Sequence, residues 1–277
     1  MDKKITEGMK DFFERLGLLE EPLGMFYTDQ EPVKGFSPKP GNLPTSEMEK
    51  RGEINWGSIF ENFSCVIGNI WRARRMGTPA YFDRERFGCL GGAFYLGFLK
   101  PQLDFIAHYI STGIPNQIQG EHYLESPEIT RHFFQEVDPR PAPARYCVFK
   151  PISQFAINEQ PELVIFFARG EVLCGLNQLA TFVTNDFEAV CSPFGAGCTN
   201  LVTWPLKYLA EGKLKAVLGG WDPSDRKFFK PDELAFTIPL EMFERMVLRW
   251  PESFLKTPTW EIVRKKINRS RRIWGEG

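Results

Sequence analysis

The sequence predicts an α/β protein in which a mixed sheet is flanked by helices within a single compact domain. Short apolar runs bounded by turn-forming residues alternate with longer segments that carry apolar residues at helical spacing. A chain of 277 residues, 43% of them hydrophobic, can bury a large core. The Pro-rich segment 138–144 separates a helix-rich part from a strand-rich part. The predicted domain therefore spans 1–277, with two possible internal halves, 1–138 and 144–277.

Helices are predicted where apolar residues recur three or four positions apart. The first predicted helix ends before Gly17, a residue typical of helix termini. Segment 59–76 has two interpretations: one continuous helix, or a helix that Ser64 caps and that begins at Cys65. The predicted helices are 2–16, 59–76, 90–98, 101–111, 127–137, 171–183, 199–209, 240–249 and 258–269.

Strands are predicted where short apolar runs lie between turn formers. The run 163–168 is apolar throughout, so we expect it in the centre of the sheet with both faces buried. The Pro- and Gly-rich connection 30–57 is interpreted as a long loop and a candidate lid. The predicted strands are 22–28, 146–149, 163–168, 189–191, 216–218 and 234–238.

Charge and hydropathy narrow the class of partner. Lys and Arg number 34 against 35 Asp and Glu, so the net charge of -1 creates no field that attracts nucleic acid or an anionic membrane. No apolar signal segment begins the chain, and no apolar run approaches the length of a membrane span. We therefore expect a cytoplasmic protein whose partner is a small molecule or a redox protein. Homo-oligomerisation stays open.

Two cysteine-containing loops carry the strongest chemical signal. In a cytosolic chain, cysteines are expected to be reduced thiols that serve packing, metal binding or catalysis. Cys191 and Cys198 bracket a loop with two glycines and a proline directly before a predicted helix. At Cys198, the free N–H groups and the helix dipole would favour a thiolate. Segment 87–92 repeats this arrangement and places Cys89 at a helix start.

The thiols predict a metal centre with ligands from separated loops. Structural zinc sites usually contain tight C-x2-C pairs, and the sequence has none. Four thiolates from separated loops suit a [4Fe-4S] cluster in a redox or electron-transfer protein. Cys174 is a substitute ligand, whereas Cys147 alternates with apolar residues in a strand and is expected to pack in the core. The predicted metal ligands are Cys65, Cys89, Cys191 and Cys198.

Two other functions stay open. In a metal-free binding protein, glycines at the helix starts would receive an anionic small molecule, and loop 30–57 would close over it. In a thiol-dependent enzyme, one cysteine of low pKa would attack an electrophile. Trp221 follows two glycines and is expected to seal a loop rather than cover a pocket. The candidate ligand-binding glycines are Gly88, Gly91, Gly195 and Gly197.

The two halves share one cysteine pattern. Cys65 and Cys89 have the same separation as Cys174 and Cys198, and Gly88 and Gly197 each precede the second cysteine. One coincidence of spacing among six cysteines is weak evidence for a repeat. Duplication is therefore an open interpretation.

Four short motifs lie in a characteristic order along the chain. They are Leu-Glu-Glu-Pro-Leu-Gly-Met-Phe-Tyr at 19–27, Ala-Arg-Arg-Met-Gly at 73–77 after Cys65, Phe-Gly-Cys-Leu-Gly-Gly-Ala at 87–93 and Phe-Thr-Ile-Pro at 236–239. In this order the chain resembles the bacterial and archaeal family called domain of unknown function 169. The resemblance implies a single α/β domain with cysteines near a shared site. It implies no catalytic role.

Overall fold

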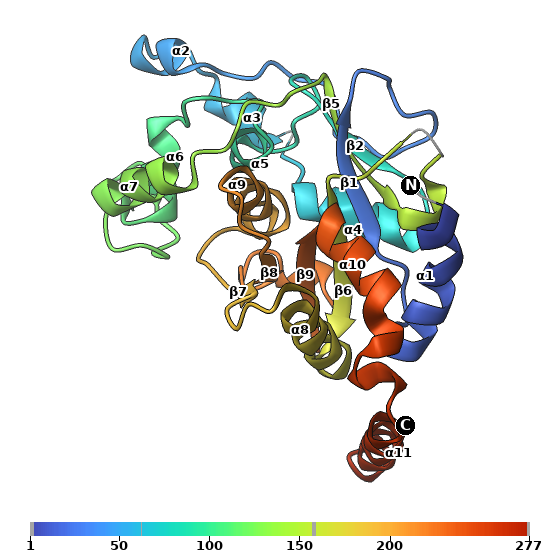
Figure 1. The fold of residues 1–277 in the computed structure, drawn as a ribbon. Helices are drawn as coiled ribbons and strands as arrows, with labels where there is room; N and C mark the ends of the chain where they lie inside the picture. The colour runs from blue at the N-terminus through green and yellow to red at the C-terminus, as the bar shows by residue number, and fades with distance from the viewer. Residues whose placement is uncertain (1–2, 62, 157–158, 276–277) are drawn as a thin grey trace.

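A seven-stranded mixed sheet forms the centre of the protein, as the computed structural model shows for residues 3–61, 63–156 and 159–275 (Figure 1). The strand order is β2-β5-β1-β6-β9-β8-β7, and all neighbours pair antiparallel except β7 with β8. The α/β prediction is therefore confirmed. The strands are β1 (Leu23–Thr28), β2 (Ala80–Phe82), β5 (Tyr146–Pro151), β6 (Leu163–Arg169), β7 (Val190–Cys191), β8 (Ala216–Gly219) and β9 (Glu233–Pro239).

Helices cover both faces of this sheet (Figure 1). Residues of α1, α8 and α10 pack on one face, while residues of α4, α5, α6 and α9 belong to the core on the other face. The helices are α1 (Lys3–Leu16), α2 (Ser46–Lys50), α3 (Trp56–Glu61), α4 (Val66–Met76), α5 (Leu90–Tyr95), α6 (Asp104–Ile110), α7 (Pro127–Val137), α8 (Gly170–Thr184), α9 (Trp204–Ala210), α10 (Leu240–Arg249) and α11 (Pro258–Ile273).

Strand β6 shows why the sheet needs helices on both faces. Leu163, Ile165 and Phe167 point into the core that includes α4 and α5. The alternate residues Val164 and Phe166 point into the core that includes α8 and α10. Successive side chains of a strand lie on opposite faces, so a continuous apolar run must be covered twice. The prediction that this strand is buried on both faces is confirmed.

The region around Cys65 corrects one predicted helix. A continuous helix over 59–76 is wrong, because α3 ends at Glu61 and α4 begins at Val66. Cys65 lies at the N-cap position of α4 but makes no side-chain capping bond there. The second interpretation, a helix start near Cys65, is therefore closer to the structure. Its proposed cap, Ser64, instead accepts a hydrogen bond from Asn69.

The predicted helix 199–209 contains an irregular first turn. Thr199–Thr203 form a π-helix, and α9 follows from Trp204. Pro205 has no N–H group, so the regular ladder of bonds to the fourth preceding residue is interrupted here. The N–H of Trp204 donates to the carbonyl of Thr199, which widens the turn. Cys198 immediately precedes this wide turn.

Several short elements escaped prediction because they are too short to show a periodic pattern. They include β2, with three residues, and the separate hairpin of β3 (Gly113–Ile114) and β4 (Ile118–Gln119). Loop 30–57 contains the five-residue α2. Strand β5 lies between β1 and β2, so the predicted halves 1–138 and 144–277 share one sheet. Within the described ranges, no helix has the length and apolarity that a membrane span requires.

Candidate functional site

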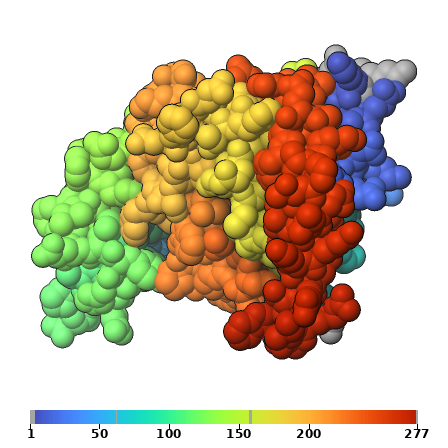
Figure 2. All heavy atoms as spheres, turned by 60° about the horizontal axis from the view of Figure 1, so that its bottom comes forward, coloured from blue at the N-terminus to red at the C-terminus, as the bar shows by residue number. Residues whose placement is uncertain are grey.

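A cavity of about 840 Å³ lies between the first-half helices and two second-half loops. Helices α3, α5 and α6 and the start of α4 line one side, together with Glu121 and Tyr123. Loops 192–196 and 221–225 line the other side. Figure 2 shows the green α6–α7 region beside orange segments of the second half. The cavity lies between these two parts. The site therefore depends on segments that are distant in sequence.

Aromatic side chains dominate the walls of the cavity. Phe105, Tyr109 and Phe133 line it together with Phe60, Phe63, Phe194 and Trp221. The last four are large apolar side chains that remain exposed, by 45% at Phe60, 58% at Phe63, 48% at Phe194 and 53% at Trp221. Exposed apolar side chains gathered in one place are typical of a binding surface.

Trp221 lines this cavity, so it does more than seal a loop. Its Nε1 donates a hydrogen bond of 2.7 Å to the Ser192 hydroxyl on the neighbouring loop. That bond holds the indole in a fixed position while half of its surface stays exposed. Trp221 is therefore placed to contact a molecule in the cavity.

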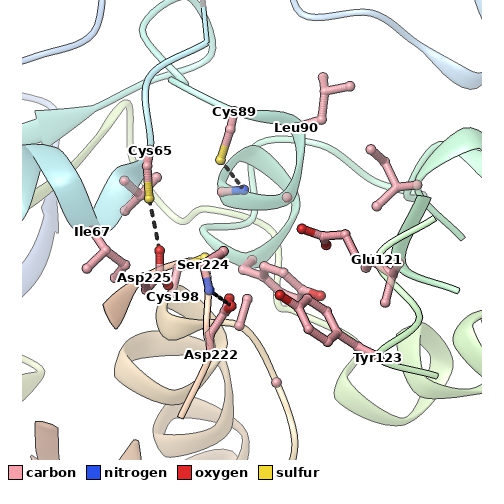
Figure 3. Close-up of a pocket in the computed structure, with 18 of the residues that line it drawn as sticks. Cys65, Ile67, Cys89, Leu90, Glu121, Tyr123, Cys198, Asp222, Ser224 and Asp225 are labelled. Atoms are coloured by element: carbon pink, nitrogen blue, oxygen red, sulfur yellow. Dashed lines mark hydrogen bonds between the residues drawn. The ribbon is translucent and has the colours of Figure 1, made fainter. Parts of the chain in front are cut away.

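Three of the four predicted metal ligands line the same cavity: Cys65, Cys89 and Cys198 (Figure 3). The Cys65 thiol donates to Asp225 Oδ1 at 3.2 Å, and Cys89 Sγ accepts from the Gly92 N–H at 3.2 Å. Each of these two cysteines stands at the N-cap of a helix. Separated loops thus bring three thiols to one cavity.

These thiols are neutral in the folded protein. Burial raises the pKa of Cys89 and Cys198 above the usual range, and burial followed by the Asp225 charge raises that of Cys65. The expected thiolate at Cys198 is therefore corrected: desolvation outweighs any favourable effect of the helix start. A neutral thiol is a poor nucleophile, so the geometry gives no support to thiol catalysis.

Other cysteines lie apart from this group. Cys191, the fourth predicted ligand, does not line the cavity, and its thiol points to the Ala216 carbonyl at 3.5 Å. Cys174 is exposed on α8. Cys147 is fully buried in β5, which confirms its predicted packing role. Across residues 3–61, 63–156 and 159–275, no group of three or more His, Cys, Asp or Glu side chains is arranged to hold a metal ion. The cluster stays a prediction.

The candidate glycines have different surroundings. Gly91 and Gly195 line the cavity, whereas Gly88 does not and instead contacts Ser64. The Gly197 N–H donates to Asp225 Oδ2 at 3.1 Å. A Cβ at Gly197 would lie 2.3 Å from that oxygen, so only glycine permits this approach. Gly197 therefore helps to position a carboxylate, a role that the sequence did not indicate.

Three carboxylates line the cavity and were missed in the sequence: Glu121, Asp222 and Asp225. Asp225 is 4% exposed, and burial followed by the nearby Asp222 charge raises its pKa to about 6. Burial and the same Asp222 charge also raise the pKa of Glu121. The available signal was the turn 219–223, whose Asp222 is followed three residues later by Asp225.

Asp225 predicts a specific pH dependence of stability. Its pKa rises from 3.8 to about 6 in the fold, so between these values the native state binds more protons than the unfolded chain. Stability contributed by this group is present at low pH and is lost as the pH rises through about 6. Asp225→Asn should remove this decline, gaining about 2 kcal/mol relative to wild type between pH 4 and pH 7.

Urea denaturation at several pH values measures this difference. Asp11→Asn, at an exposed position on α1, is the matched control and should run parallel to wild type. The gap between Asp225→Asn and wild type should widen from about pH 4 to about pH 6 and then level off. Parallel profiles for Asp225→Asn and wild type would show that burial does not perturb this carboxyl.

Comparison with known proteins identifies a family whose description names no activity. The sequence model for domain of unknown function 169 (DUF169), described as "Uncharacterised ArCR", matches residues 12–249. Comparison with curated proteins and with solved structures gave no match. The site must therefore be interpreted from its own chemistry.

Proposed function

The chain belongs to the DUF169 family, and we propose that this member binds a small organic molecule in the cavity lined by Cys65, Cys89 and Cys198. The observation that carries the proposal is an aromatic cavity of about 840 Å³ with a few polar groups that converge on it from both sides. Small-molecule sites typically enclose about 300–1,000 Å³, with mostly apolar walls and a few convergent polar groups. The cavity has both properties.

Close packing around Cys65, Cys89 and Asp225 supports a preformed site. A Cβ at Gly92 would lie 2.4 Å from the Val66 side chain, so glycine lets α5 approach the start of α4 closely. Asp225 is held from two directions, by the Cys65 thiol and by the Gly197 N–H. A wall that is fixed before binding loses less conformational entropy when a ligand arrives.

The charge of the walls does not favour an anionic ligand. Glu121, Asp222 and Asp225 face the cavity, against one cationic lining side chain, Lys227, in the described part of the chain. Gly91 and Gly195 do lie in the wall, but the carboxylates set the sign of the local charge. We therefore propose a neutral or cationic molecule in place of the anionic one expected from the glycines.

Binding of the neutral dye Nile red tests the proposed function. We expect saturable binding of about one dye per chain, with a blue shift and increased emission in an apolar cavity. Trp221→Ala should weaken binding about five- to thirtyfold, since a central aromatic contact contributes on the order of 1–2 kcal/mol. Trp274→Ala is the matched control, because Trp274 is 80% exposed beyond α11 and does not line the cavity. Equal effects of the two substitutions would contradict the proposal.

A cysteine-ligated metal centre, such as an iron–sulfur cluster, is a second candidate. It is favoured by the convergence of Cys65, Cys89, Cys198 and Asp225 on one cavity. Thiolates are the ligands of such clusters, and a carboxylate or a bound molecule would take the position that Cys191 does not reach. The thiols would have to lose their protons and move, because no described group is arranged for metal as it stands.

One protein preparation can distinguish small-molecule binding from a metal centre. Protein purified without oxygen would be analysed for iron, zinc and acid-labile sulfide before dye titration. A metal centre requires that Cys65→Ser, Cys89→Ser and Cys198→Ser each lose the metal, while Cys174→Ser on α8 retains it. Colourless, metal-free protein that binds Nile red would leave small-molecule binding as the function.

A further inference from the structure

The carboxylates of the cavity lack ion-pair partners. None of Glu121, Asp222 and Asp225 forms an ion pair with a cationic side chain among the described residues, although ion pairs are frequent elsewhere in the molecule. Asp222 Oδ1 accepts a hydrogen bond from the Ser224 N–H at 2.9 Å. Lys227 lines the cavity and lowers the pKa of Asp225, but its Nζ lies over the Phe228 ring at 5.2 Å. The site therefore holds an excess of negative charge.

These carboxylates come from opposite sides of the cavity. In Figure 3, Glu121 and Tyr123 come from the green segment on the right, while Asp222 and Asp225 come from the loop after β8. Three carboxylates that face one space repel one another. A positive charge in that space would offset the repulsion.

The aromatic walls favour the same kind of charge. Tyr109, Tyr123 and Trp221 line the cavity close to the carboxylates in the wall. The negative face of an aromatic ring attracts a cation, most strongly when the cation is an organic ammonium that has lost its water. A metal ion would gain little here, since aromatic rings are not its ligands and no described side-chain group is arranged to hold it.

One buried group is also available to a ligand. Cys198 is 6% exposed and lines the cavity, and its thiol makes no hydrogen bond within the described residues. Buried polar groups usually have a partner, so an unpartnered thiol in a cavity wall indicates a contact that a bound molecule would complete. A thiol also packs as a small apolar group, so Cys198 can contact the apolar body of a cation.

We propose that the ligand is an organic cation, in which a protonated amine or quaternary ammonium group is carried on an apolar or aromatic body. This inference rests on the proposed small-molecule function. The ammonium group would lie between Glu121 and Asp222, and the body would lie against the aromatic walls. The ammonium group and the apolar body of such a molecule would each contact a complementary surface in one cavity.

Three probes with one shared body test the charge preference. They are 4-tert-butylbenzylamine, 4-tert-butylbenzyl alcohol and 4-tert-butylbenzoate, which are cationic, neutral and anionic at pH 7. Each would displace Nile red in competition. We expect the amine to compete roughly tenfold more strongly than the alcohol, and the benzoate to be the weakest.

Substitution of the carboxylates localises the effect. Glu121→Gln and Asp222→Asn should each reduce the amine-to-alcohol ratio about threefold or more. Glu125→Gln, on the same loop as Glu121 but outside the lining, is the matched control and should keep the ratio. The ratio cancels any general change in the cavity, since the two probes share one body.

The outcomes separate the inference from the function on which it rests. If Nile red binds but the amine has no advantage over the alcohol, the organic-cation inference is overturned and the binding function stands. A cation preference that survives both carboxylate substitutions also overturns the inference. If Nile red does not bind in the cavity, the proposed function itself falls.

Discussion

Arg74→Met is expected to lower the free energy of unfolding by about 3–5 kcal/mol. The Arg74 side chain is 5% exposed and donates to Glu20 at 2.8 Å and to Glu233 at 2.9 Å. Its guanidinium also stacks on the Phe167 ring at 3.7 Å from the centroid. Methionine would fill part of the volume but leave the Glu233 carboxylate, 4% exposed, without its nearest cation. Lys230 Nζ, 3.9 Å from Glu233 and 54% exposed, would remain as a weak partner, so the buried carboxylate would lose most of its compensation.

Urea denaturation followed by circular dichroism measures this loss. Arg75→Met is the matched control, because Arg75 is exposed on the same helix and only lies over Trp71 at 4.9 Å. It should change stability by no more than about 0.5 kcal/mol. The double variant Arg74→Met with Glu233→Gln should recover part of the loss, since it removes the buried charge that Arg74 no longer compensates. Equal losses at positions 74 and 75 would refute the argument.

Local patterns were sufficient to predict most of the architecture. Helix α7 has the predicted bounds of 127–137 because its Ser126 cap, Pro127 and apolar face are all local signals. Strand β6 was placed correctly because a short apolar run with turns at both ends can hardly be exposed. Strand β2 was missed, since its three residues show no period and are held by pairing with β5. Its position follows from tertiary contacts alone.

The site was predictable only in part, because it too depends on tertiary contacts. Cysteines at helix starts are visible in sequence, and Cys65, Cys89 and Cys198 do line one cavity. Whether a thiol points into that cavity depends on strand direction and neighbouring packing, which turn Cys191 toward the Ala216 carbonyl. Glu121 and the Asp222–Asp225 turn meet only after α6, β4 and β8 have assembled. No local pattern encodes that meeting.

Gly88→Ala is expected to destabilise the protein and to disturb the cavity. Gly88 has φ +77, a left-handed conformation that costs other residues about 1–2 kcal/mol. A Cβ there would also lie 2.3 Å from the Ser64 carbonyl oxygen. Displacing packed backbone typically costs about 1–3 kcal/mol more, so the expected total loss is about 2–5 kcal/mol. Urea denaturation measures it.

Gly88→Ala should also weaken dye binding, because the contact between Gly88 and Ser64 joins the two segments that carry Cys89 and Cys65. The Ser64 N–H donates to the Gly88 carbonyl at 3.0 Å, so one hydrogen bond links the residues that precede Cys65 and Cys89. Pushing the segments apart should separate the two thiols and weaken Nile red binding. Gly52→Ala is the matched control, because Gly52 has φ +68 but nothing within 4 Å of an added Cβ. It should lose only the left-handed backbone contribution and bind the dye normally. If both variants lost the same stability and bound dye equally, the close approach at Gly88 would not shape the site.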